Sequence, residues 1–211
     1  MEVEDMSRCS ELNENLRIIL ERRSITFFDS SKEIEDDLLI KVIELASLAP
    51  SSYNLQPWEV VIVKSKENKK KLREICFNQE KVEEASANIV VIANYKRALD
   101  NIPRVLEDAK SKGYNFTTNS DLIAMFYSNN AKMRAVRDAS LFAMNIMIIA
   151  RFFNLETHPM EGFNEQMLRE FLKIEEYKDI PMIIAIGYKD PTKELLPQLK
   201  RFGFNEFGKI I

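Results

Sequence analysis

Glycine is scarce in this sequence, and its scarcity excludes two common kinds of nucleotide site. Only five glycines occur among the 211 residues, namely Gly113, Gly162, Gly187, Gly203 and Gly208. No two of them have the spacing of a dinucleotide-binding fingerprint or of a Walker loop. We therefore expect neither a Rossmann-type dinucleotide site nor a P-loop.

Histidine and cysteine are scarcer still. His158 is the sole histidine, so a histidine-rich metal site is impossible, and a Ser-His-Asp or Cys-His catalytic group would have to use that residue. Cys9 and Cys76 are too few for a disulfide framework and form no CxxC motif. Because disulfides accumulate in oxidising compartments, and no secretion-signal pattern is visible, we expect a cytoplasmic location.

The sequence also lacks a net positive charge and long apolar runs. The formal net charge is −3, whereas nucleic acids and membrane surfaces are bound through a basic footprint. The longest apolar run, from Ala139 to Ala150, is interrupted by Asn145 and is shorter than the ~20 apolar residues that span a bilayer. We expect no nucleic-acid partner and no membrane partner.

The composition that is present is typical of one folded domain. Hydrophobic residues make up 45% of the chain and charged residues 30%, which is an ordinary balance for a globular protein. A chain of this length can bury one sizeable core. We therefore expect a single domain over residues 1–211.

Hydrophobic periodicity predicts helices mixed with strands. Apolar residues at helical spacing predict helices over about 10–23, 34–49, 68–75 and 164–172. Apolar, β-branched runs predict strands over about 58–63, 88–95 and 180–188, with a short extended piece at 155–159. Residues 137–153 are apolar nearly all round, which is typical of a helix buried by its own core or by a partner subunit. Asn154 is expected to cap that helix in the left-handed conformation.

Two regions have weaker patterns. Residues 96–130 have mixed polarity and several turn formers, so we expect loops and short helices that form a mobile lid over the core. Residues from about 190 to 211 show no clear period, and we expect them to form a C-terminal extension.

Two polar segments have the composition of a binding site. Arg22-Arg23-Ser24 places two guanidinium groups and a hydroxyl at the end of a predicted helix, and guanidinium groups bind phosphate oxygens bidentately. Arginines at a helix C-terminus also simply satisfy carbonyl groups and the helix dipole. The loop 50–58 is pinned by prolines and offers Ser, Asn and Gln side chains to a ligand. Its alternative role is an ordinary helix-to-strand connection.

The order of the motifs resembles the FMN-dependent nitroreductase family. The basic pair and serine are followed by Ala-Pro-Ser-Ser-x-Asn-x-Gln-Pro-Trp at 49–58, then Phe-Asn-Gln-Glu-Lys at 77–81 and Pro-Met-Glu-Gly-Phe at 159–163. The resemblance covers roughly residues 12–188. It implies an α+β fold with a mainly antiparallel central sheet flanked by helices. It also implies a homodimer with exchanged C-terminal extensions and one FMN at each subunit interface.

The resemblance further implies a set of flavin contacts. The FMN phosphate is expected against Arg22 and either Lys200 or Arg201. Lys81 is expected near N1 and O2 of the flavin, where a positive charge stabilises the reduced ring. The loop at 50–56 is expected to reach the flavin held mainly by the other subunit. The full set expected at the cofactor is Arg22, Arg23, Ser24, Thr26, Pro50, Ser51, Ser52, Asn54, Gln56, Asn78, Lys81, Pro159, Met160, Glu161, Gly162, Lys200 and Arg201.

Chemistry of this kind needs no nucleophile or metal from the protein, because the flavin carries the redox step. We expect NADH or NADPH to reduce FMN and leave, and a nitroaromatic or quinone to take its place over the same ring face. Glu161 is the candidate catalytic side chain, with a local turn contact as its alternative role. Phe126 and Tyr127 are candidates for contact with the acceptor. Their alternative role is packing in the core.

Three positions depart from the family pattern or have no role in it. Thr26 stands where Arg or Lys is common, which leaves Lys81 alone to supply positive potential near N1. Asn154 stands where glycine is more usual. His158, next to the Pro-Met-Glu-Gly turn, is interpreted as a hydrogen-bonded residue at a strand end.

The sequence is also compatible with other functions. One is a flavin-binding, redox-responsive module without turnover, which the departure at Thr26 favours. A second keeps the fold and FMN but acts on another substrate, by reductive dehalogenation or enoate reduction. A third, an α+β domain with no cofactor, would require four correctly ordered motifs to coincide by chance.

Overall fold

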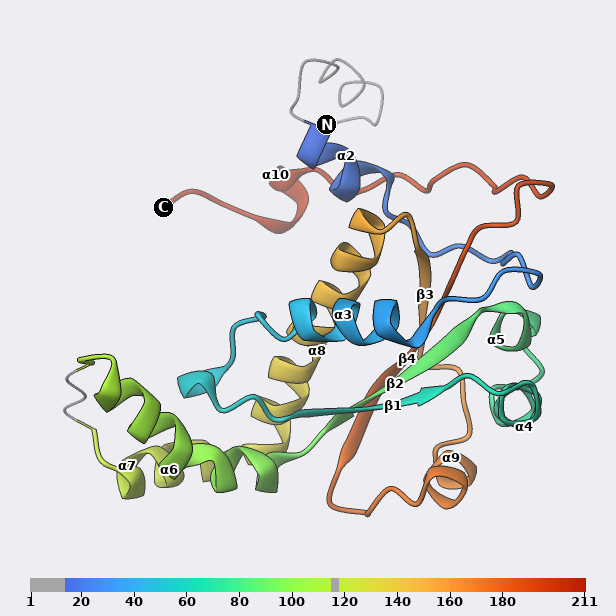
Figure 1. Ribbon diagram of the computed structural model, residues 1–211. Helices are drawn as coiled ribbons and strands as arrows, with labels where there is room; N and C mark the ends of the chain where they lie inside the picture. The colour runs from blue at the N-terminus through green and yellow to red at the C-terminus, as the bar shows by residue number, and fades with distance from the viewer. Residues whose placement is uncertain (1–13, 115–117) are drawn as a thin grey trace.

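The computed structural model describes residues 14–114 and 118–211, and a four-stranded sheet with helices on both faces forms its centre (Figure 1). The strands follow the spatial order β1 (Trp58–Val63), β2 (Ala87–Ala93), β4 (Asp179–Gly187) and β3 (Glu156–Met160). Each neighbouring pair is antiparallel. The predicted α+β class with an antiparallel sheet is therefore confirmed.

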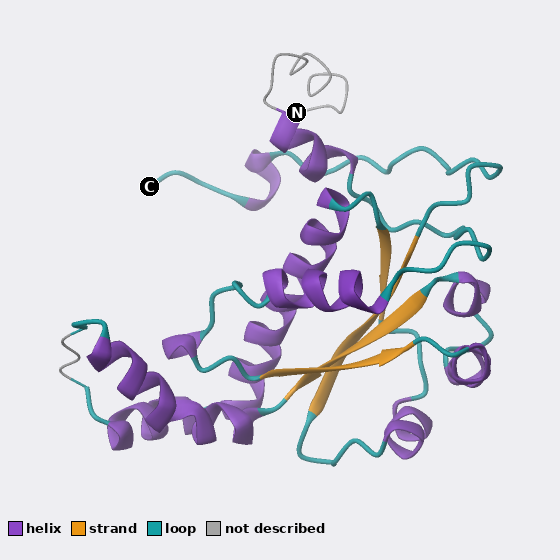
Figure 2. Cartoon of the chain, in the orientation of Figure 1, coloured by secondary structure: helices purple, strands orange, loops and turns teal. Residues whose placement is uncertain are grey.

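Helices of very different length surround this sheet (Figure 2). The described helices are α2 (Glu14–Glu21), α3 (Asp36–Ala46), the 3-10 turn η1 (Ser52–Asn54), α4 (Lys66–Ile75), α5 (Glu80–Glu84), α6 (Tyr95–Ser111), α7 (Ser120–Ser128), α8 (Ala131–Phe152), α9 (Glu165–Leu172) and α10 (Phe204–Phe207). Helices α3, α4 and α9 begin close to their predicted starts at 34, 68 and 164, whereas α8 begins at Ala131, before the predicted start at 137. The first predicted turn, before Glu14, lies outside the described residues.

The core has two layers, one on each face of the sheet. Strand β2 is buried at every position, because successive side chains point to opposite faces. Ile89 and Val91 pack in the layer that holds α3 and α8, whereas Val90 and Ile92 pack in the layer that holds α4 and α9. The apolar, β-branched run of this strand is the sequence signature of a strand covered on both sides.

The prediction of loops and short helices over residues 96–130 was wrong. Helix α6 runs for 17 residues and α7 for nine, and both project from one end of the sheet (Figure 1). The buried stripe of α6 consists of Ala98, Ile102 and Ala109, so small alanines hide its period. Pro103 lies within the helix, where a sequence pattern indicates a break. Asn94 caps the helix by accepting a hydrogen bond from the Arg97 N–H.

Helix α8 crosses one face of the sheet and ends as predicted. Its buried side carries Phe142 and Ile146, while Leu141 and Met144 on the other side are exposed. Asn154 has φ 55°, which confirms the left-handed cap. Within the described ranges, no helix is both long and apolar enough to cross a membrane.

The chain after β4 forms an extended tail without a core of its own. It passes back toward α2 and includes only the short helix α10 (Figures 1 and 2). Arg23 Nη2 donates a hydrogen bond of 2.6 Å to the Leu196 carbonyl oxygen, which fixes the tail beside the segment after α2. Leu199, Phe202 and Ile210 are nevertheless exposed, so most of the apolar surface of the tail has no cover within this chain.

Candidate functional site

The segment after α2 is held along the edge of the sheet formed by β3. Ser24 pairs with Thr157 as a parallel bridge, and the Ile25 N–H donates to the Thr157 carbonyl oxygen at 3.2 Å. His158 Nδ1 lies 2.6 Å from the Ile25 carbonyl oxygen. His158 is therefore the hydrogen-bonded strand residue that the sequence predicted, and it positions Arg22, Arg23 and Ser24 at this edge.

Lys81 brings a positive charge to the same edge from α5. Its ammonium group is half-buried and forms no ion pair or side-chain hydrogen bond with any described residue. Burial lowers the pKa of Lys81 below its ordinary value. Burial is also the largest cause of the lowered pKa of His158, and the charge of Lys81 contributes to that shift. The positive charge of Lys81 therefore acts on His158.

The turn after β3 is tied to the segment before α5. Gln79 Nε2 donates a hydrogen bond of 2.8 Å to the Gly162 carbonyl oxygen, and the Asn164 N–H donates to the Ile75 carbonyl oxygen at 2.9 Å. A Cβ atom at Gly162 would lie 3.2 Å from Gln79 Nε2, so the close approach favours glycine here. Gln79 was missed as a site residue, although it stands inside the Phe-Asn-Gln-Glu-Lys motif.

Most of the remaining predicted residues of this half lie at its surface. Phe77 and Asn78 adopt consecutive left-handed conformations, with φ 56° and 60°, and the Asn78 side chain is exposed. Glu161 and Gly162 are exposed as well, whereas Met160 is buried under the turn. The structure therefore brings the 77–81 segment and the 159–162 segment together, as the motif order implied.

Arg22 lies directly after α2, and Arg201 lies on the tail that Arg23 binds beside this segment through Leu196. The pKa of Arg22 is lowered, first because its guanidinium group is partly buried and next because of the charge of Arg201. The carboxylate of Glu156 raises the pKa of Arg22, but this effect is smaller than the other two. Guanidinium groups in these positions are suited to binding an oxyanion.

Arg23 and Lys200 occupy different places from this pair. Arg23 binds the tail through its hydrogen bond to the Leu196 carbonyl oxygen. Its Nε atom is buried without a hydrogen-bond partner in the described chain. Lys200 is exposed on the tail. Thr26 is exposed beside the Arg23-Ser24 segment and adds no charge to it.

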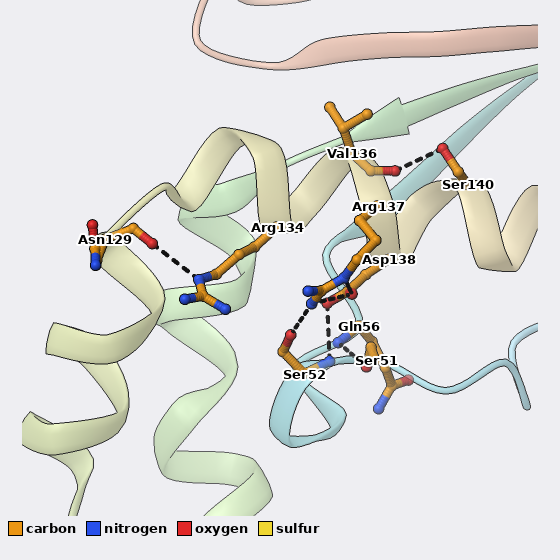
Figure 3. A network of polar contacts seen from close by, with 9 residues as sticks. All are labelled: Ser51, Ser52, Gln56, Asn129, Arg134, Val136, Arg137, Asp138 and Ser140. Carbon is orange, nitrogen blue, oxygen red and sulfur yellow. Dashed lines mark hydrogen bonds and ion pairs between the residues drawn. The ribbon is translucent and has the colours of Figure 1, made fainter. Parts of the chain in front are cut away.

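The Ser-Ser-x-Asn loop is anchored by a buried carboxylate on α8 (Figure 3). Asp138 Oδ2 accepts a hydrogen bond of 2.9 Å from the Ser52 N–H, and Asp138 is only 1% exposed. Arg137 Nη2 donates to Ser52 Oγ at 2.5 Å and also contacts Asp138 Oδ1 at 2.9 Å. Neither residue was predicted at the site. The adjacent Arg-Asp pair at the start of the predicted apolar segment 137–153 is the signal that was available.

Backbone conformation in this loop is unusual for residues with side chains. Tyr53, Asn54 and Gln56 have φ of 50°, 56° and 46°, each in a region that costs of order 1–3 kcal/mol for a non-glycine residue. The Gln56 N–H donates to Ser51 Oγ at 3.1 Å, and Asn101 Nδ2 donates to the Leu55 carbonyl oxygen at 2.8 Å. These contacts hold the strained loop in place. Pro50, which precedes it, is exposed.

The two candidate acceptor residues lie in opposite environments. Phe126 is 44% exposed; its ring packs edge-to-face on Tyr53 at 5.7 Å and lies 3.9 Å below the Arg134 guanidinium carbon. Tyr127 is 0% exposed and packs with Leu55 and Ile102 in a small cluster between α6 and α7. Core packing therefore describes Tyr127, while Phe126 faces outward next to the loop.

Comparisons with known proteins identify the family of this chain. Residues 19–188 match the model of the nitroreductase family. The chain belongs to that family. It is 32% identical over 198 residues to MhqN of Bacillus subtilis, an NAD(P)H nitroreductase by name, with 90% of this chain and 95% of MhqN covered.

Two solved structures of the same fold bear on the chemistry. A nitroreductase from Exiguobacterium sibiricum in complex with FMN has a TM-score of 0.84 and 28% identity, covering 94% of this chain and 98% of that chain. CLA-ER, an enone reductase of gut-bacterial fatty acid metabolism, has a TM-score of 0.79 and 25% identity, covering 94% of this chain and 98% of that chain. Members of this fold therefore include an FMN complex and an enone reductase.

Proposed function

We propose that this protein is an FMN-dependent NAD(P)H oxidoreductase that reduces nitroaromatic or quinone-type acceptors. The observation that carries the proposal is the match of residues 19–188 to the nitroreductase family, together with the Gln79–Gly162 hydrogen bond of 2.8 Å that joins two of the motifs typical of it. Arg22 lies in the segment held at the β3 edge, and Arg201 lies on the tail that Arg23 binds beside that segment. These two arginines are the candidate partners of the FMN phosphate.

The residues at this edge fit the parts of the cofactor. Arg22 and Arg201 would bind the phosphate, and the unpartnered Nε of Arg23 is a free donor for the ribityl chain or the pyrimidine ring. Lys81 would supply the positive charge near the pyrimidine carbonyl, and the exposed backbone at Gly162 would lie against the ring system. When bound, FMN accepts and returns a hydride, which is chemistry that no side chain can perform. Glu161 would help to position this turn.

A homodimer is part of the proposal, because a single chain carries two separated half-sites. The Arg22 half lies at the β3 edge, whereas the Ser51–Gln56 loop lies at the end from which α6 and α7 project (Figure 1). The exposed Leu141 and Met144 on α8, and the uncovered apolar side chains of the tail, are surfaces that a second copy would bury. Pairing would place the loop of one subunit against the flavin of the other.

Turnover is proposed to be ping-pong, with donor and acceptor using the same ring face in turn. Phe126, next to the Tyr53 loop, is the side chain that would contact the acceptor. A second candidate substrate class consists of α,β-unsaturated carbonyl compounds, and the similarity to the enone reductase favours it. Both candidates use the same cofactor and donor.

The test is steady-state oxidation of NADH and NADPH by purified protein whose flavin has been identified by mass spectrometry after release. Menadione, nitrofurazone and 2-cyclohexenone serve as parallel acceptors. We expect one FMN per subunit and turnover with at least the quinone or the nitro compound. Activity confined to cyclohexenone would move the assignment to the second candidate. Bound FMN without turnover for any acceptor would instead indicate a flavin-binding module.

A further inference from the structure

A groove separates α6 from the Tyr53–Trp58 loop. One cavity of about 270 Å³ is lined by Gln56, Trp58, Arg97 and Arg104. A second of about 320 Å³ is lined by Tyr53, Lys112 and Tyr114. Both include Asn54, Val105 and Asp108, so the two cavities are parts of one groove. The first alone is near the lower limit of ligand pockets, roughly 300 Å³, which suits one group of a ligand rather than a whole dinucleotide.

Two arginines, Arg97 and Arg104, give the first cavity its positive charge. Arg97, Asn101 and Arg104 follow the i, i+4, i+7 spacing, so they share one face of α6, with the arginines about 10 Å apart along the axis. Neither guanidinium group forms an ion pair or a hydrogen bond with any part of the chain that the structure describes. They line a cavity beside the amide groups of Asn54 and Gln56.

The single carboxylate in the groove does not neutralise these arginines. Asp108 Oδ2 lies 2.8 Å from Lys112 Nζ, one turn further along α6, so its charge already has a partner. The groove therefore keeps two uncompensated positive charges in a protein of net charge −3. Guanidinium groups beside amide donors form a recognition site for phosphate or carboxylate oxygens.

We propose that the α6 groove binds an oxyanion group of the small molecule that exchanges electrons with the flavin. This rests on the proposed function, since Asn54 belongs both to the loop expected at the flavin and to the wall of the groove. The oxyanion belongs either to the diphosphate of the nicotinamide donor or to a carboxylate on the acceptor. The aromatic rings of Tyr53 and Tyr114 in the second cavity suit a flat group of the same ligand.

Direct binding is tested first, by calorimetric titration of the FMN-loaded protein with inorganic pyrophosphate. FMN loading matters because it occupies the phosphate site at Arg22. We expect pyrophosphate to bind the wild type, and Arg97→Gln/Arg104→Gln to weaken that binding at least tenfold. The matched control is Lys70→Gln/Lys110→Gln, which removes the same charge from exposed positions outside the groove and should leave binding unchanged.

Absence of binding to the wild type, or equal weakening in both double variants, overturns the proposal. Trp58, the only tryptophan, lines the groove and gives a second readout by its fluorescence. Neither readout requires turnover. A protein without FMN or activity would contradict the proposed function, while the dependence of pyrophosphate binding on the two arginines would still decide whether the groove is an oxyanion site.

The source of the oxyanion is separated by kinetics, because ping-pong turnover gives donor and acceptor independent values of kcat/KM. A loss in the Arg97→Gln/Arg104→Gln variant for NADH and NADPH, but not for nitrobenzene or 4-nitrobenzoate, assigns the groove to the donor diphosphate. A loss for 4-nitrobenzoate alone assigns it to acceptor carboxylates. Unchanged values for all four substrates contradict the proposal.

Discussion

The two halves of the candidate site are held in place by different means. The Arg22–Ser24 segment and the Glu161–Gly162 turn are fixed mainly through their backbone, which bonds to strand β3 and to the end of α4 and also contacts the side chains of His158 and Gln79. The Tyr53 loop rests instead on side chains, namely Asp138, Arg137 and Asn101, and on the small cluster between α6 and α7. Side-chain supports can be changed without altering the sheet. We infer that the first half serves cofactor binding and that the second half determines substrate choice.

The largest expected effect comes from the support of the second half. Asp138→Ala should lower the free energy of unfolding by about 3 kcal/mol, because the Ser52 N–H and the Arg137 guanidinium lose a buried charged acceptor. Urea denaturation measures this. The control Asp100→Ala, at an exposed position of α6, should change stability by less than about 0.5 kcal/mol. Equal effects of the two variants would remove the anchoring role of Asp138.

The first half is tested through cofactor affinity. Arg22→Ala should weaken FMN binding by about 10- to 100-fold, since a charge-assisted hydrogen bond contributes about 1.5–3 kcal/mol. Quenching of FMN fluorescence on binding measures the Kd. Arg17→Ala removes an exposed charge from α2 and should leave the Kd unchanged. An unaltered Kd in the Arg22 variant would place the phosphate elsewhere.

Neighbouring residues on α7 sharpen the difference between packing and substrate contact. Phe126→Ala should raise the acceptor KM by about 3- to 10-fold, as loss of an aromatic contact worth about 0.5–1.5 kcal/mol implies. Tyr127→Phe should leave KM unchanged and stabilise the fold by up to about 1 kcal/mol, because its buried hydroxyl has no partner within the described chain. A KM effect in the Tyr127 variant alone would reverse this assignment.

The smallest effect concerns pH and His158. Burial lowers the pKa of this imidazole in the native state, so the unfolded chain binds a proton more readily. Stability is therefore complete above the unfolded pKa of about 6.5 and decreases as the pH falls below it. Urea unfolding of His158→Gln should show a shallower decrease over that range than the wild type. An identical decrease would show that other groups cause it.

Some of the fold could be predicted because local pattern and tertiary environment agree. The β1 bounds match those predicted, since a β-branched run follows Pro57 and ends before a lysine-rich helix. Helix α6 could not be predicted, because its buried positions include two alanines and its interior contains Pro103. The burial of Ala98 and Ile102 depends on α7 and on Leu55, which sequence period alone does not place.

Some residues of the candidate site could likewise be predicted from the sequence, and others could not. The motifs indicated Arg22, Lys81 and Gly162, because guanidinium, ammonium and glycine each have a direct physical role at a flavin. They did not indicate Asp138 or Gln79, whose importance comes from contacts with residues distant in the sequence. Nor did they indicate the pair of arginines in the α6 groove, which are brought together only by the helix.

The central claim, that bound FMN is reduced by a nicotinamide donor, is tested most directly by anaerobic mixing. The purified protein is mixed with NADH or NADPH without oxygen, and its absorbance near the flavin maximum of ~450 nm is followed. The account predicts bleaching at a rate that saturates with donor concentration, and recovery when menadione is added. A bound flavin whose absorbance stays unchanged with both donors would contradict it.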